Sequence, residues 1–181
     1  MLPPMLSTTN STERSERVCT ETNPAHGGYT NARDLARLYS AMLVRLGGDP
    51  VEALPSTETL AAFCSPARPQ VYDKVLDREC SFGLGFMTEL REHAFGERCG
   101  PRSFGHSGNV GTSFGFADPD RDLAVGVVFN GMVDYESAAL RRRALVNALY
   151  RDLEEHAALH EEQAETAHEE GSRFRIRRRR R

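Results

Sequence analysis

Hydrophobic residues recur at helical spacing near the start of the chain. Within residues 31–46, seven apolar or aromatic side chains follow one another at intervals of three and four: Ala32, Leu35, Ala36, Tyr39, Met42, Leu43 and Leu46. This spacing places them on one face of a helix, which Gly47–Gly48 end. A second, short helix is expected over residues 56–64, because Pro66 stops it.

A long helix is predicted to begin at Asp134. Its apolar stripe lies on roughly one side of the helix and consists of Ala138, Leu145, Leu149 and Leu153. Beyond about residue 155 the stripe thins to alanines among glutamates, so that part is either a solvated helix or disorder. The sequence therefore lacks an apolar face in its last part, beyond about residue 155.

Short apolar runs at residues 81–90, 102–107, 112–117 and 123–130 predict strands. The last run is apolar on both faces, which is typical of a strand inside a sheet. Asp118 to Asp122, "DPDRD", has the composition of a turn. Residues 66–80 and 91–101 are expected to be loops, and residues 1–28 a polar loop segment.

Charge is concentrated at the C-terminal end. Residues 151–172 hold eight acidic residues and one arginine, and residues 173–181 hold seven arginines, including the run Arg177–Arg181. Such a run can attract nucleic acid or an anionic surface. Loose pairing with the preceding acidic segment explains it equally well, so we do not expect nucleic-acid binding.

Cysteine and histidine patterns give no strong metal signal. The four cysteines have no C-x-x-C spacing, so a zinc site is not expected, although a disulfide is possible. His156 and His160 have the i, i+4 spacing that can bind a metal. They lack the H-E-x-x-H order and lie on an alanine–glutamate surface, so we expect neither a metal nor another cofactor.

No targeting segment is recognisable in the sequence. The first residues have neither a basic region nor an apolar run typical of a signal peptide, and no stretch is long enough to cross a membrane. The chain as given is therefore expected to be cytoplasmic. A periplasmic or secreted location stays open if a signal precedes this segment.

The stretch "FGHSGNVGTSFGFADPD", residues 104–120, is the main candidate for chemistry. It is not a nucleophile elbow, because Asn109 replaces the last glycine and a strand follows where a helix is needed. It is not a phosphate-binding loop, because it contains no lysine. Gly108 and Gly111 would let a substrate approach the backbone, and only one of His106 and Ser107 can face a cleft.

Three motifs resemble the serine β-lactamase-like superfamily, which includes class C β-lactamases, penicillin-binding-protein-like peptidases and related esterases. "GGYTNARDLARLYSAML" looks like a glycine pair followed by its S-T-A-x-D-L-A-R-F helix, and "SFGLGFM" is similar to its Y-G-L-G-W segment. "FGHSGNVGTSFGFADPDRDLAVGVVFN" resembles the strand that carries its K-T-G or H-x-G triplet. The motifs occur in the family's order, but only its C-terminal portion is represented.

The resemblance implies roles for four residues. His106, Ser107 and Gly108 take the places of the triplet, in which His106 anchors a substrate carboxylate or assists proton transfer. Ser107 is expected to donate hydrogen bonds rather than attack. The backbone N–H of Asn109 is the implied oxyanion donor.

The family's nucleophilic S-x-x-K motif cannot occur in this chain. Lys74 is its single lysine, and Val71 stands three residues before it. A serine hydroxyl needs such a base to attack at neutral pH. Tyr29-Thr30-Asn31 matches the family's Y-x-N motif but overlaps the first helix, and we interpret it as coincidence.

The resemblance implies an α+β fold with an antiparallel sheet flanked by helices, lacking the family's N-terminal part. We expect a partial domain over residues 29–153 and an acidic helix or disorder with an arginine-rich tail over 154–181. One functional hypothesis is part of a serine hydrolase that acts on a small-molecule or peptide-like amide or ester. The alternative is a non-catalytic relative or interaction module.

Overall fold

The computed structural model describes residues 29–108 and 111–179. By its internal contacts the chain divides into two units, Met1–Asn31 and Ala32–Arg181. The predicted loop over residues 1–28 lies outside the described residues. The second unit contains the helices and strands that follow.

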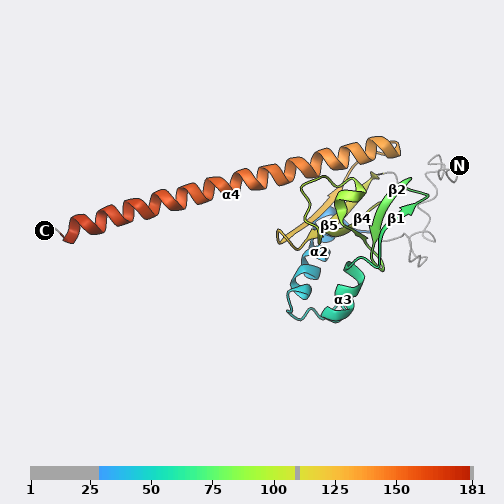
Figure 1. The fold of residues 1–181 in the computed structure, drawn as a ribbon, viewed down its shortest axis with the longest axis horizontal. Helices are drawn as coiled ribbons and strands as arrows, with labels where there is room; N and C mark the ends of the chain where they lie inside the picture. Colours follow the sequence, from blue (N-terminus) through green and yellow to red (C-terminus); the bar gives the residue numbers. More distant parts are fainter. Residues whose placement is uncertain (1–28, 109–110, 180–181) are drawn as a thin grey trace. The chain divides into compact units, whose positions relative to one another are not determined.

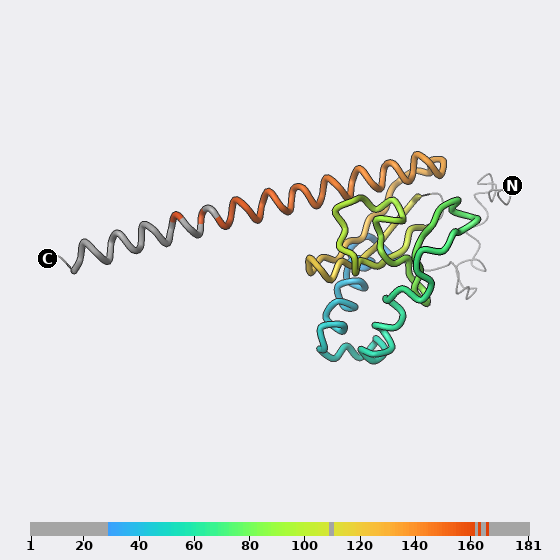
Figure 2. The backbone as a smooth tube through the Cα atoms, viewed as in Figure 1, coloured from blue at the N-terminus to red at the C-terminus, as the bar shows by residue number. Residues whose placement is uncertain are grey.

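The centre of this unit is a six-stranded antiparallel sheet. Each strand pairs with the next along the chain, so the order across the sheet is β1-β2-β3-β4-β5-β6, a meander that Figure 2 traces. The strands are β1 Arg68–Asp73, β2 Arg78–Phe82, β3 Met87–Thr88, β4 Phe104–Ser107, β5 Ser113–Asp118 and β6 Leu123–Val128. The helices are α2 Ala32–Leu46, α3 Thr57–Cys64, the short 3-10 helix η1 Leu90–His93, and α4 Tyr135–Arg179. The expected α+β fold with an antiparallel sheet and flanking helices is confirmed.

Helices cover both faces of the sheet (Figure 1). On one face α2 and α3 pack on the strands, with a core of Tyr39, Met42, Leu60, Phe104 and Ala117. On the other face η1 and α4 pack, with a core of Met87, Leu90, Phe95, Cys99, Phe114, Phe116, Val146 and Tyr150. The sheet is therefore the middle of three layers.

Helix α2 follows its sequence pattern and lies close to the sheet backbone. A Cβ atom added to Gly126 of β6 would lie 2.4 Å from the Ala32 carbonyl oxygen and 2.6 Å from the Ala36 nitrogen. Real side chains do not approach so closely, so only glycine lets the helix settle here. Tyr39 fills the corresponding space above Gly115 of β5.

Helix α4 uses a different stripe from the one expected. Ala138, Arg142, Val146 and Tyr150 are its buried residues, whereas Leu145 is 41% exposed and Leu153 43% exposed. Asp134 caps the helix, as its Oδ1 accepts a hydrogen bond from the Ser137 N–H at 2.9 Å. The predicted start is thus right. Of the predicted stripe, Ala138 is buried and Leu149 is half-buried, whereas Leu145 and Leu153 are exposed.

An arginine occupies a core position in α4, because backbone carbonyl groups accept hydrogen bonds from its guanidinium. Arg142 donates from Nη2 to the His93 carbonyl at 2.9 Å and from Nε to the Ala94 carbonyl at 3.3 Å. Its guanidinium also lies 4.7 Å from the ring centre of Phe95. Burial lowers the pKa of Arg142.

Three strand predictions need correction. Residues 66–80, expected to be a loop, contain β1 and the start of β2. Residues 81–90 do not form one strand, because the chain leaves the sheet after Phe82; a Cβ atom on Gly83 would lie only 2.2 Å from the carbonyl oxygen of Phe63 in α3. β6 lies at the edge of the sheet rather than inside it, since it pairs only with β5 in the part of the chain that is described.

The distal part of α4 is a solvated helix. The helix continues to Arg179, and every side chain described beyond Glu154 is exposed. None of the helices in the described ranges has an apolar stretch long enough to cross a membrane.

Candidate active site

Strands β4 and β5 form the hairpin that carries the predicted triplet. His106 lies opposite Gly115, and Ser107 lies opposite Phe114. The hairpin continues past β4, because the Gly108 N–H donates to the Ser113 carbonyl at 2.7 Å. Asn109, the implied oxyanion donor, lies outside the described residues.

His106 and Ser107 occupy opposite faces of the sheet. His106 shares its face with Phe104 and Gly115, which belong to the α2 side. Ser107 shares its face with Phe114, which belongs to the core under α4. His106 is exposed and Ser107 is half-buried, so the histidine is the member of the pair that a substrate on the α2 side would meet.

The Ser107 carbonyl group favours the tautomer of His106 that carries its proton on Nδ1. Its Nδ1 lies 2.8 Å from the Ser107 carbonyl oxygen. A neutral ring that donates Nδ1–H to this carbonyl carries its lone pair on Nε2. The ring can then accept a proton or a hydrogen bond through Nε2.

Tyr39 is a neighbour of this site that the sequence pattern assigned only to the core. Its ring occupies the space above Gly115, directly opposite His106 in the register. Burial raises the pKa of the Tyr39 hydroxyl, and a contact with the His106 backbone opposes this shift. The hydroxyl therefore stays protonated and supports β4 from the α2 side.

The edge of β4 at Ser107 has no strand partner in the described structure. β3 pairs with β4 only through Phe104 and Gly105. Because the Gly108 N–H points toward β5, the Ser107 N–H and C=O alternate to the β3 side. An extended substrate could align along this short open edge.

Of the two hairpin glycines, Gly111 is required by the protein's own packing. A Cβ atom on Gly108 would lie 2.4 Å from Ser113 Oγ, and one on Gly111 would lie 2.3 Å from the Cβ of Ala138. Gly111 also has a φ of 64°, which favours glycine. Gly111 therefore makes room for α4, whereas the atom nearest to Gly108 is a serine hydroxyl that can rotate away. That Gly108 lets a substrate approach the backbone stays a prediction.

Two hollows of the described structure lie away from the tip of the hairpin. A cavity of about 270 Å³ lies at the other end of β4 and is lined by Thr88, Phe104 and Cys64 among others. A hollow of about 550 Å³ lies between α2 and the start of β6. His106, Ser107 and Gly108 line neither of them, and the His106 side chain is exposed.

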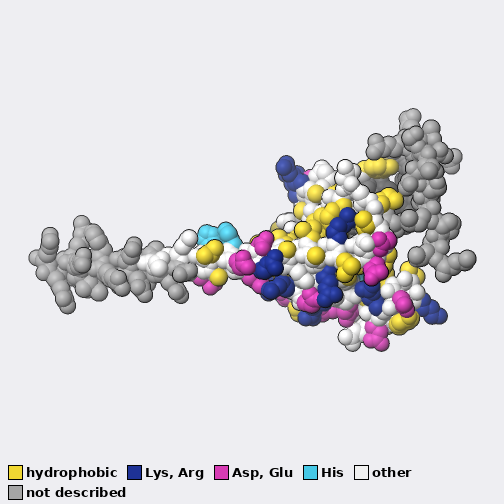
Figure 3. Space-filling view, turned by 90° about the horizontal axis from the view of Figure 1, so that it is seen from above, with side chains coloured by type: hydrophobic (Ala, Val, Ile, Leu, Met, Phe, Trp, Pro, Cys, Tyr) yellow, Lys and Arg dark blue, Asp and Glu magenta, His cyan; other side chains and the backbone are white. Residues whose placement is uncertain are grey.

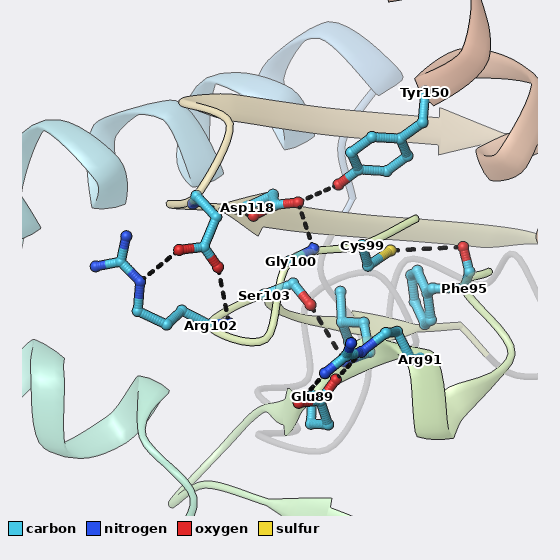
Figure 4. Close-up of polar contacts among 11 residues, drawn as sticks. Glu89, Arg91, Phe95, Cys99, Gly100, Arg102, Ser103, Asp118 and Tyr150 are labelled. Carbon is cyan, nitrogen blue, oxygen red and sulfur yellow. Dashed lines mark hydrogen bonds and ion pairs between the residues drawn. The ribbon is translucent and has the colours of Figure 1, made fainter. Parts of the chain in front are cut away.

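A buried carboxylate holds the far end of β5 (Figure 4). Asp118 is fully buried; its Oδ2 accepts a hydrogen bond from the Gly100 N–H at 2.8 Å and another from the Tyr150 hydroxyl, and its Oδ1 accepts from the Asp120 N–H at 3.0 Å. Burial, together with the Asp118 hydrogen bond, raises the pKa of Tyr150. Both carboxylate oxygens are engaged by the protein itself, so this group is a structural link between β5 and α4.

The described residues contain no group of three or more histidine, cysteine or acidic side chains placed to hold a metal. Cys64, Cys80 and Cys99 are free thiols. Burial raises the pKa of Cys64 and that of Cys99 to about 12, so neither is a ready nucleophile at neutral pH.

A comparison with family profiles identifies the class of protein to which this chain belongs. The β-lactamase family profile matches residues 2–150, so the chain belongs to the β-lactamase family. A search of curated protein sequences gave no significant match.

Several solved structures are similar to the chain. They include a β-lactamase from Mycobacterium bovis (23% identity, TM-score 0.49, covering 64% of this chain and 42% of that one). A penicillin-binding protein homolog from Caulobacter crescentus has 29% identity and a TM-score of 0.46, covering 64% and 31%. EstA from Arthrobacter nitroguajacolicus has 29% identity and a TM-score of 0.45, covering 67% and 32%. The chain thus spans less than half the length of each of these proteins.

Proposed function

We propose that this chain forms the substrate-binding strand of a serine hydrolase that cleaves an amide or ester by acyl transfer. The observation that carries the proposal is the geometry of β4. An exposed His106, whose Nδ1 contacts the Ser107 carbonyl, stands beside a strand edge that has no partner at Ser107 among the described residues, in a chain of the β-lactamase family.

The residues have distinct roles in this proposal. His106 anchors a substrate carboxylate or moves a proton at Nε2. Ser107 positions the substrate through its backbone at the strand edge, and Gly108 keeps the turn free of a side chain. The N–H of Asn109 stabilises the developing oxyanion.

The attacking serine must come from outside the sequence given, because no S-x-x-K motif occurs in it. A nucleophile-bearing segment would also satisfy other features of the structure. Within the described residues one edge of β6 has no strand partner, and Leu145 and Leu153 of α4 are exposed. We infer that the strands and helix of the missing portion cover these surfaces.

The second candidate is a non-catalytic interaction module. The same open edge of β6 and the absence of S-x-x-K favour it, since an exposed apolar edge strand pairs readily with another chain. The DNA that adjoins the reading frame separates the two candidates. A segment encoding S-x-x-K followed by Y-x-N supports the hydrolase, and a sequence without either supports the module.

Labelling with a fluorescent penicillin and with a fluorescent fluorophosphonate tests the hydrolase directly. The chain alone should remain unlabelled by both, and the protein completed by the adjoining segment should be labelled stoichiometrically. Replacing His106 by Ala in the completed protein should slow acylation by about 10²-fold or more. His156→Ala, an exposed histidine on α4, serves as the control and should leave the rate unchanged.

Two results would contradict the proposal. Stoichiometric labelling of the chain alone would mean that it holds an activated serine. Equal acylation rates for His106→Ala and His156→Ala would remove His106 from the reaction. Neither result depends on which amide or ester is the natural substrate.

A further inference from the structure

Two histidines face each other on the exposed part of α4, away from the candidate active site. His156 and His160 have ring centres 4.4 Å apart and an interplanar angle of 64°. Figure 3 shows histidine side chains as one patch on the helix. Both side chains are exposed, and neither has a hydrogen bond or ion pair to another described residue.

We propose that His156 and His160 together bind a divalent transition-metal ion such as Zn²⁺. The sequence alone favoured two unliganded surface histidines. The ring separation of 4.4 Å changes this interpretation, because both imidazoles lie on the same side of two successive turns. Imidazole nitrogen is a good ligand for zinc, nickel and copper ions.

The ring separation fits the geometry of such an ion. Zn–N bonds of about 2.0–2.1 Å at a tetrahedral angle need two nitrogens roughly 3.3 Å apart. Rings whose centres are 4.4 Å apart can present nitrogens at this distance by side-chain rotation alone. Because His156 and His160 lie on one helix, the backbone holds them at this spacing before the ion arrives.

The protein supplies two ligands, and water completes the coordination shell. Asp152 lies one turn before His156 on the same face and is largely exposed, paired only at 4.0 Å with Arg151. Its carboxylate can assist the ion directly or through water. Mg²⁺, which prefers oxygen ligands and retains its water, should not bind here.

Metal binding at this site would act on the helix itself. Every described side chain from residue 155 onward is exposed, so this part of α4 depends on local interactions. An ion that joins two successive turns stabilises the helical state over the open one by mass action. The distal part of α4 should therefore become more helical when the ion is bound.

Titration of the untagged full chain with zinc chloride tests the site. Isothermal titration calorimetry should show one Zn²⁺ per chain, and the circular dichroism signal at 222 nm should gain helix at saturation. His160→Ala should weaken binding by at least about tenfold, because the second imidazole no longer acts at high effective concentration. Both histidines are exposed, so the variants should fold as the parent does.

A spacing control separates a paired site from non-specific binding. The double variant His160→Ala with Glu161→His keeps the number of histidines but moves one of them to i+5, on another side of the helix. It should bind Zn²⁺ as weakly as His160→Ala and gain no helix. Equal affinity of the parent chain and this double variant, or unchanged helicity of the parent on saturation, would overturn the proposal.

Discussion

The hydrogen bond from Tyr150 to Asp118 should make a large contribution to stability, and Tyr150→Phe isolates it. Tyr150 is 1% exposed and Asp118 is fully buried, so neither group reaches water. The substitution keeps the ring and its packing against Phe116, whose ring centre lies 6.5 Å away. The hydroxyl is therefore the only group lost.

The size of the effect follows from the charge of the acceptor. Hydrogen bonds to charged groups contribute about 1.5–3 kcal/mol, and a buried acceptor that loses its donor finds no water to replace it. The N–H groups of Gly100 and Asp120 still donate to Asp118 at 2.8 and 3.0 Å, so the carboxylate loses one of its three hydrogen bonds and keeps two. We expect a loss of about 2 kcal/mol in the free energy of unfolding.

Urea unfolding followed by far-UV circular dichroism measures this loss. With a slope of about 2 kcal/mol/M, the midpoint should fall by about 1 M. Tyr72→Phe is the matched control, because Tyr72 also donates its hydroxyl to an aspartate, Asp77, but at an exposed site. Its midpoint should not move. Equal midpoints for the two variants would refute the argument that burial gives the Asp118 bond its value.

Three further predictions concern the rest of the described structure. Burial lowers the pKa of His93, so the unfolded chain binds a proton before the folded chain does as the pH falls. The contribution of His93 to the free energy of unfolding should therefore be fully present above about pH 6.5 and decrease below it. The decrease of the urea midpoint with falling pH should be smaller in His93→Gln. An equal decline in both would contradict this. Gly126→Ala should cost about 1–3 kcal/mol by pushing α2 off β6, whereas Gly131→Ala, which meets no atom within 4 Å, should leave the melting temperature unchanged. A chain that ends after Glu154 should unfold at the parent's urea concentration, because the described side chains beyond it are exposed; a lower midpoint would show that the distal helix supports the fold.

The sequence predicted the helices where a single periodicity dominated. The stripe in α2 is regular, and every one of its seven members is buried or half-buried. In α4 the periodicity misled, because Arg142 interrupts the apolar pattern on the buried face while leucines continue it on an exposed one. Only the three-dimensional position of the η1 carbonyls explains how an arginine can occupy the core.

The strand errors have equally specific causes. β1 was missed because it is exposed along nearly all its length, so it has no alternation of apolar and polar residues. β6 was placed inside the sheet because it is apolar on both faces. The structure shows that α2 covers one face of β6 and the α4-side core covers the other. The apolar pattern therefore indicates that both faces are covered, and it does not indicate how many strands pair with β6.

The candidate site was predicted residue by residue from a motif, but its supports were not. His106 and Ser107 could be found because the triplet is contiguous. Tyr39 and Tyr150 are separated from it by tens of residues and look like ordinary core positions in their helices. Their contacts with β4 and β5 depend on how the layers pack, which no local pattern records.

Helix α4 contacts the candidate hairpin at both ends of its second arm. At the turn, Ala138 packs against Gly111, and Arg141 donates to the Gly111 carbonyl at 2.8 Å. At the base, Tyr150 binds Asp118. The two contact points lie about 18 Å apart along the helix, from Ala138 to Tyr150. Helix α4 therefore holds the second arm of the hairpin at both ends, and β5 in turn holds the strand of His106 in register through its pairing with β4.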